Sequence, residues 1–154
     1  MTLHLYLGVE GVLLRRTDPE GNGESGFELV PHALNFLRWA SVKFECHWLT
    51  RLDHDGGFGE TERAFKAALG LPETSGELDL LFHLVQPTYW ETCKLEGIDL
   101  DSDFKWIDDN PDQESLAGLN RRSLMDRLMI CRTPDDFARI MCQLTPMEVI
   151  PHGW

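Results

Sequence analysis

Residues 3–14 read LHLYLGVEGVLL, and this stretch decides the fold class. Its first six residues are mostly apolar, which is typical of a strand that is covered on both faces, as in a parallel sheet. Gly8 and Glu10 then leave the carboxyl end of the predicted strand. Because ligands of open α/β sheets bind beyond these carboxyl ends, the stretch predicts both the first strand of such a sheet and the first loop of a binding site.

Strand-like and helical patterns alternate along the rest of the chain. Apolar runs typical of strands cover 44–50, 104–110 and 127–133, and helical patterns cover 31–43, 60–70, 112–120 and 134–144. Residues 76–93 fit either a helix or a strand. Alternation over short loops predicts α/β architecture: a doubly wound, mainly parallel, Rossmann-like sheet flanked by helices and formed by a single domain over residues 1–154.

Local signals refine the ends of these elements. A hairpin-like flap is predicted after the first strand, around a polar turn that contains Pro19, Gly21, Gly23 and Gly26. Pro31 suits the first turn of the first helix, and Gly70 suits the end of the second. Thr133 is the predicted N-cap of the last helix, with Pro134 at its first position.

Composition narrows the classes of function. The 154 residues include 42% hydrophobic residues, enough for a folded core, and carry a formal net charge of −12. Such a surface repels phosphate backbones, and no basic patch is visible in the sequence, so we expect no nucleic-acid partner. The four cysteines lack metal-binding spacing and predict reduced, structural thiols. No apolar run is long enough for a membrane span, and we expect a cytoplasmic protein.

Polar residues gather where the predicted strands end. Thr and Arg donors, a lysine and paired carboxylates are expected at one sheet edge, contributed by Glu10, Thr50, Arg51, Lys94, Asp108 and Asp109. The hydroxyl would donate to phosphate oxygens, the lysine would neutralise their charge, and the carboxylates would hold Mg²⁺ through oxygen. This edge is therefore a candidate site for a phosphate and a hard cation.

The order of these residues resembles the haloacid dehalogenase-like (HAD-like) hydrolase superfamily, most of whose members are phosphatases or phosphotransferases. The resemblance covers most of the chain and rests on LHLYLGVEGVLL, HWLTR, Lys94 and FKWIDDNPD. The short flap, without a large inserted segment, is similar to the flap of capless members.

The resemblance implies a role for each matched residue. Gly8 stands where the family has its nucleophilic aspartate, and Glu10 stands at the acid/base position, as a degenerate version of it. Thr50, with Arg51 beside it, matches the phosphate-binding hydroxyl, Lys94 the charge-neutralising lysine, and Asp108 with Asp109 the acids that bind Mg²⁺. Glycine supplies neither a nucleophile nor a metal ligand, so Mg²⁺ affinity should be weakened, and loss of a covalent nucleophile costs several orders of magnitude in rate.

We therefore expect a HAD-like pseudoenzyme with little or no phosphatase activity, which serves as a binding or regulatory module for a small anion or phosphate. One alternative is a metal-dependent phosphohydrolase in which Glu10 and Asp108 or Asp109 activate water directly. Another is an acidic domain that binds a protein partner.

Other polar clusters have simpler interpretations. Asp108 and Asp109 could instead form a charge pair at a helix N-terminus. The run Asp53-His54-Asp55 could bind a metal or act as an acid/base, but it is typical of a solvated loop. The other histidines show no ligand spacing, and the tryptophans suit the core, with Trp154 as the one expected to be exposed.

Overall fold

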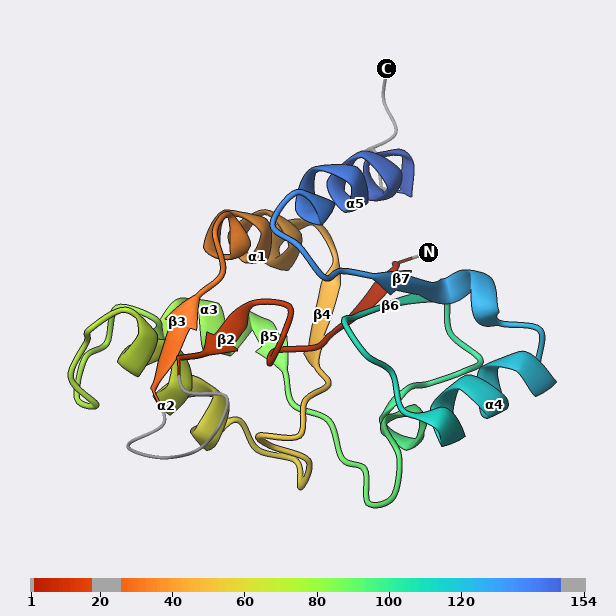
Figure 1. The fold of residues 1–154 in the computed structure, drawn as a ribbon, viewed down its shortest axis with the longest axis horizontal. Helices are drawn as coiled ribbons and strands as arrows, with labels where there is room; N and C mark the ends of the chain where they lie inside the picture. Colours follow the sequence, from red (N-terminus) through yellow and green to blue (C-terminus); the bar gives the residue numbers. More distant parts are fainter. Residues whose placement is uncertain (1, 18–25, 148–154) are drawn as a thin grey trace.

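The computed structural model describes residues 2–17 and 26–147. Its central sheet contains five strands: β1 (His4–Leu7), β4 (Glu45–Trp48), β5 (Val85–Gln86), β6 (Phe104–Asp108) and β7 (Leu128–Ile130). All four pairings within this sheet are parallel, and the spatial order is β5-β4-β1-β6-β7 (Figure 1). The order reverses between β1 and β6, so the edge beyond these two strands is the expected place for a ligand.

Helices cover both faces of the sheet. The α-helices are α1 (Ala33–Lys43), α2 (Gly59–Ala68), α3 (Asp79–Leu84), α4 (Gln113–Arg121) and α5 (Asp136–Leu144). Single 3₁₀ turns form η1 (Lys94–Gly97), η2 (Met125–Arg127) and η3 (Thr145–Met147). In Figure 1, α1 and α5 lie on one side of the sheet and α4 lies on the other. The predicted α/β architecture with a parallel sheet between helices is confirmed.

The alternation of side chains along β1 divides the core in two. Leu5 and Leu7 are fully buried on the face that packs against α1 and α5. Tyr6 points to the opposite face and packs with Trp106 of β6 and Leu119 of α4. Because successive residues of a strand face opposite sides, a mostly apolar strand is required where both sides are covered.

A separate two-stranded antiparallel ribbon follows β1. It consists of β2 (Leu14–Arg16) and β3 (Phe27–Leu29), and the N–H of Thr17 donates to the carbonyl of Gly26 at 3.0 Å. The extended pieces predicted on either side of the polar turn therefore pair with each other. Most of that turn, including Pro19, Gly21 and Gly23, lies outside the described residues.

Two predicted helix starts are wrong. α1 begins at Ala33, not at Pro31, because His32 before it has a left-handed backbone with φ of 71°. α5 begins at Asp136, and Thr133 is not its N-cap. The Asp136 carboxylate itself accepts the backbone N–H groups of Arg132 and Thr133, at 2.8 and 3.0 Å.

Other local predictions are confirmed. Gly70 follows the end of α2 with φ of 69°, the left-handed conformation in which glycine is favoured. The ambiguous segment 76–93 contains α3 followed directly by the short strand β5. All four cysteines are free. Cys46 and Cys131 are buried, whereas Cys142 is exposed, and burial raises the pKa of the Cys46 thiol to about 12. No helix within the described ranges combines the length and apolarity needed to cross a membrane.

Candidate functional site

A cavity of about 420 Å³ opens at the carboxyl edge of the sheet, beside the point where the strand order reverses. Its lining brings together all the side chains that the sequence placed at this edge, and it adds two arginines from the ribbon. The lining residues are Glu10, Gly11, Arg15, Arg16, Thr50, Arg51, Lys94, Asp108, Asp109 and Asn110.

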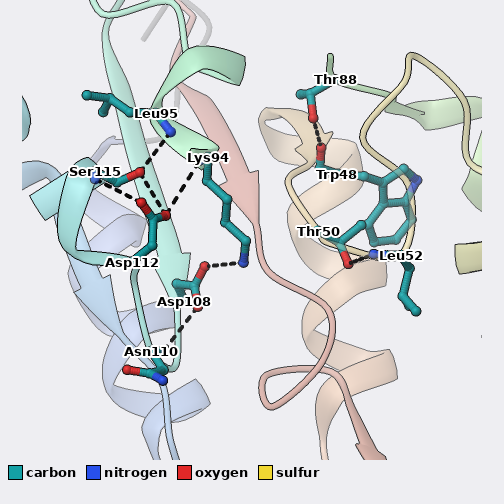
Figure 2. Close-up of polar contacts among 10 residues, drawn as sticks. All are labelled: Trp48, Thr50, Leu52, Thr88, Lys94, Leu95, Asp108, Asn110, Asp112 and Ser115. Atoms are coloured by element: carbon teal, nitrogen blue, oxygen red, sulfur yellow. Dashed lines mark hydrogen bonds and ion pairs between the residues drawn. The ribbon is translucent and has the colours of Figure 1, made fainter. Parts of the chain in front are cut away.

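The central interaction of the cavity is an ion pair between Lys94 and Asp108 (Figure 2). Lys94 Nζ lies 2.8 Å from Asp108 Oδ2, and the two side chains are 11% and 1% exposed. Asp108 Oδ1 accepts the backbone N–H of Asn110 at 3.1 Å. Burial makes such a carboxylate costly unless it is paired, and here both of its oxygens have donors.

Lys94 is held in place by the first turn of α4. Asp112 is the N-cap of that helix, and its carboxylate accepts the backbone N–H of Ser115 at 2.9 Å and the Ser115 hydroxyl at 2.8 Å. Ser115 Oγ in turn accepts the N–H of Leu95, the residue after Lys94, at 3.0 Å (Figure 2). Asp112 therefore caps the N-terminus of α4, the place considered above as an alternative for Asp108 and Asp109. Asp108 instead lies at the end of β6.

Thr50 leaves the carboxyl end of β4 and faces the cavity from another strand. Only 1% of its surface is exposed, and its Oγ1 accepts the N–H of Leu52 at 3.1 Å. A hydroxyl also has one proton to donate. No acceptor for that proton is found among residues 2–17 and 26–147, so it is available to a ligand.

Arginines add positive charge at the rim. Arg16 pairs with Glu10 at 3.3 Å and lies over the ring of Phe27, and Arg15 pairs with Glu28 at 3.3 Å. Arg51 has no carboxylate partner in the part of the chain that the structure describes. Four basic and three acidic side chains line the cavity, in a chain whose formal net charge is −12. The lining of the cavity thus carries one more basic than acidic side chain, on a protein that is acidic as a whole.

Asp109 is folded over Gly11 at the base of the first loop. A Cβ on Gly11 would lie 2.0 Å from Asp109 Oδ2, and Gly11 has a left-handed φ of 86°, a conformation that favours glycine. Burial, followed by the effect of the neighbouring Asp108, raises the pKa of Asp109 to about 6. Its carboxyl group therefore changes charge close to neutral pH.

Gly8 lies directly beside Asp108. Its N–H donates to the carbonyl of Ile107 at 2.8 Å, and a Cβ on Gly8 would lie 3.3 Å from the Asp108 carboxylate. A side chain at this position would project toward Asp108. The arrangement fits Mg²⁺ poorly, because Gly8 has no side-chain oxygen and Lys94 already contacts one oxygen of Asp108.

The Asp53-His54-Asp55 loop is not part of this cavity. The Asp53 carboxylate accepts the backbone N–H groups of Glu60 and Thr61 and the Thr61 hydroxyl, at 3.3, 2.7 and 2.8 Å. His54 Nδ1 lies 3.1 Å from the carbonyl of Trp90. Asp53 therefore accepts the free backbone N–H groups at the start of α2, and His54 contacts a neighbouring loop, so both residues have structural partners.

The tryptophans predicted for the core lie there. Trp48 and Trp106 are fully buried, and Trp39 packs against the core while partly exposed. Trp154 lies outside the described residues.

A second polar cluster was not apparent from the sequence. His4, Glu45 and His47 have potential ligand atoms that all lie within 4.8 Å of one another. The two histidines are 43 residues apart, and they meet because His4 pairs in register with Glu45 in the parallel sheet. In the sequence, Glu45 and His47 alternate along one predicted strand and His4 begins another. This pattern indicates a cluster only once the register of the two strands is known.

Comparison of the chain with protein-family models and with curated proteins finds no match.

The buried ion pair predicts strong energetic coupling between its partners. We expect Lys94→Met to lower the free energy of unfolding by about 3 kcal/mol, because Asp108 is left buried and unpaired. The double variant Lys94→Met/Asp108→Asn should lose at least about 1 kcal/mol less than the sum of the single variants in urea unfolding. The exposed pair Arg122–Asp101 is the control and should show coupling of about 0–1 kcal/mol. Equal coupling in the two pairs would contradict this interpretation.

The raised pKa of Asp109 predicts a pH-dependent stability difference. The folded pKa of about 6 lies above the ordinary value of 3.8, so ionisation of Asp109 destabilises the fold above pH 6, and this cost is relieved as the pH falls toward 4. Asp109→Asn should therefore be more stable than the parent at pH 7–8, by on the order of 1 kcal/mol after allowing for solvent screening, with a smaller difference near pH 4. Urea unfolding across this range measures it. Asp101→Asn, whose side chain is 89% exposed in the parent, should show no such trend.

Proposed function

We propose that this chain is a HAD-like domain without the nucleophilic aspartate, and that it binds a phosphate-type anion in the cavity as a binding or regulatory module. The observation that carries the proposal is the convergence of Lys94, Arg51 and the free Thr50 hydroxyl proton on one cavity of an acidic protein. Such an anion could be a free phosphate or the phosphate group of a larger ligand.

The groups around the cavity suit an oxyanion with several acceptor oxygens. An arginine fork donates two parallel N–H groups, and Arg51 has no carboxylate in the described chain to compete for them. Thr50 supplies a neutral donor from a buried, fixed position. Lys94 has three donors, and its bond to Asp108 uses one of them.

The same geometry argues against turnover through an aspartyl-phosphate. Gly8 has no side chain to attack phosphorus, and the oxygens of Glu10 are engaged by Arg16 at 3.3 and 3.4 Å. Removal of one member of a catalytic unit costs several orders of magnitude in rate. We therefore expect binding to persist where catalysis is lost.

A second candidate function, hydrolysis by direct activation of water, is favoured by one observation. A carboxyl group with a pKa near 6, such as Asp109, is suited to act as a general acid or base at neutral pH. Hydrolysis of an aryl phosphate that is abolished by Asp109→Asn would support this candidate over the binding module.

The anion site is tested with sulfate, whose charge is constant around neutral pH. Sulfate should raise the melting temperature of the parent, because a ligand that binds only the folded state stabilises it. Arg51→Gln should weaken the sulfate affinity about tenfold, since a charge-assisted hydrogen bond contributes about 1.5–3 kcal/mol. Calorimetric titration measures the affinity directly.

The matched control is Arg38→Gln, which removes the same charge from an exposed position on α1. It should bind sulfate as the parent does. Equal losses in Arg51→Gln and Arg38→Gln would mean that overall charge, not this cavity, attracts the anion.

Restoring the missing carboxylate provides a test of the HAD-like assignment. Gly8→Asp, alone or with Glu10→Asp, should raise Mg²⁺ affinity on the order of tenfold, because the new side chain projects toward Asp108. Calorimetric titration measures the affinity, and an aryl phosphate reports any phosphatase activity gained. Gly59→Asp adds the same charge where a side chain has free space, and it should leave Mg²⁺ affinity unchanged. If the double variant binds Mg²⁺ no better than the parent, the assignment of these motifs fails.

A further inference from the structure

Three side chains with metal-binding atoms lie together at the amino end of the sheet, away from the cavity described above. His4 begins β1, and Glu45 begins the adjacent strand β4, where the two are directly paired. His47 lies two residues beyond Glu45, so all three side chains project from the same face of the sheet. Two neighbouring central strands thus supply two imidazoles and one carboxylate to one point.

The distances within this cluster match those around a metal ion. His4 Nδ1 lies 3.0 Å from His47 Nε2 and 3.3 Å from Glu45 Oε2, and all three groups offer ligand atoms within 4.8 Å of one another. Ligands at about 2.0–2.1 Å from a tetrahedral zinc ion are separated from one another by roughly 3.3 Å. An ion could therefore be reached by small rotations of these side chains, without a change in the backbone.

The surroundings fix the imidazoles and leave one side open. Tyr6 stacks on His47 with ring centroids 4.6 Å apart, and the Tyr6 hydroxyl accepts the N–H of Asp99 at 3.2 Å. His4 and Glu45 also line an open depression of about 650 Å³. The three side chains are therefore covered on one side and open on the other. The open side leaves room for water as a fourth ligand of a bound ion.

We propose that His4, Glu45 and His47 form a binding site for a divalent transition-metal ion of the zinc class. The site presents Nδ1 of His4, Nε2 of His47 and a carboxylate oxygen of Glu45. Two imidazoles and one carboxylate suit Zn²⁺ and other ions with affinity for nitrogen, whereas Mg²⁺ prefers oxygen ligands. The site is independent of the proposed anion cavity, which lies at the opposite end of the same strands.

Without metal, the cluster is held by a hydrogen bond between the two imidazoles and by the contact of His4 with Glu45. Metal binding requires both facing ring nitrogens to be free of protons, so each neutral imidazole then carries its proton on its other nitrogen. The hydrogen bond between the imidazoles involves only His4 and His47. The third group, Glu45, adds a carboxylate that would partly neutralise the charge of a divalent ion.

The test is a calorimetric titration of the full, metal-stripped chain with Zn²⁺, with Mg²⁺ as the comparison ion. We expect one Zn²⁺ per chain, a Zn²⁺-dependent rise in melting temperature, and no effect of Mg²⁺ at the same concentration. His47→Gln should weaken Zn²⁺ binding on the order of 100-fold, since it removes one of three protein ligands. Visible absorption of bound Co²⁺ reports the coordination geometry and should be lost in the same variant.

Two controls and one milder variant complete the test. His83→Gln removes an exposed histidine from α3, and Cys142→Ser removes an exposed thiol, so both should bind Zn²⁺ as the parent does. Glu45→Gln changes a largely exposed side chain, folds without loss of core contacts, and should also weaken binding. The proposal is overturned if the parent does not bind Zn²⁺, or if His47→Gln and Glu45→Gln bind it with the affinity of the parent.

Discussion

The Lys94–Asp108 ion pair determines the chemistry at the carboxyl edge of this sheet. A carboxylate that is 1% exposed must be compensated, and the lysine compensates it at 2.8 Å. Gly8 lies directly beside Asp108 and has no side chain, so it contributes no carboxylate at this point. Because this pair is neutral, the positive charge of the cavity comes from the arginines in its lining, which are Arg15, Arg16 and Arg51.

Much of the architecture could be predicted because its signals are local. Buried strands of a parallel sheet are continuous apolar runs, and the turn residues between them are glycines and prolines, so the alternation of strands and helices was visible in the sequence. The residues of the cavity were also predictable, because the carboxyl ends of parallel strands meet at one edge. The sheet did bring Glu10, Thr50, Lys94 and Asp108 to a single cavity.

The remaining features depend on contacts that sequence patterns do not encode. Thr133 is a good capping residue, but Asp136 accepts the backbone N–H groups at that end, and only the loop geometry decides between them. The joining of His4 to Glu45 and His47 depends on the register of two strands more than forty residues apart. The pairing of Lys94 with Asp108 likewise requires knowledge of how η1 packs on α4.

The Ser115 hydroxyl has a mechanical consequence. It joins the first turn of α4 to the backbone beside Lys94 through bonds of 2.8 and 3.0 Å, and Ser115 itself is buried. The backbone that carries Lys94 is consequently attached to the first turn of α4. The position of the ammonium group beside Asp108 therefore depends on where α4 packs, although no residue of α4 lines the cavity.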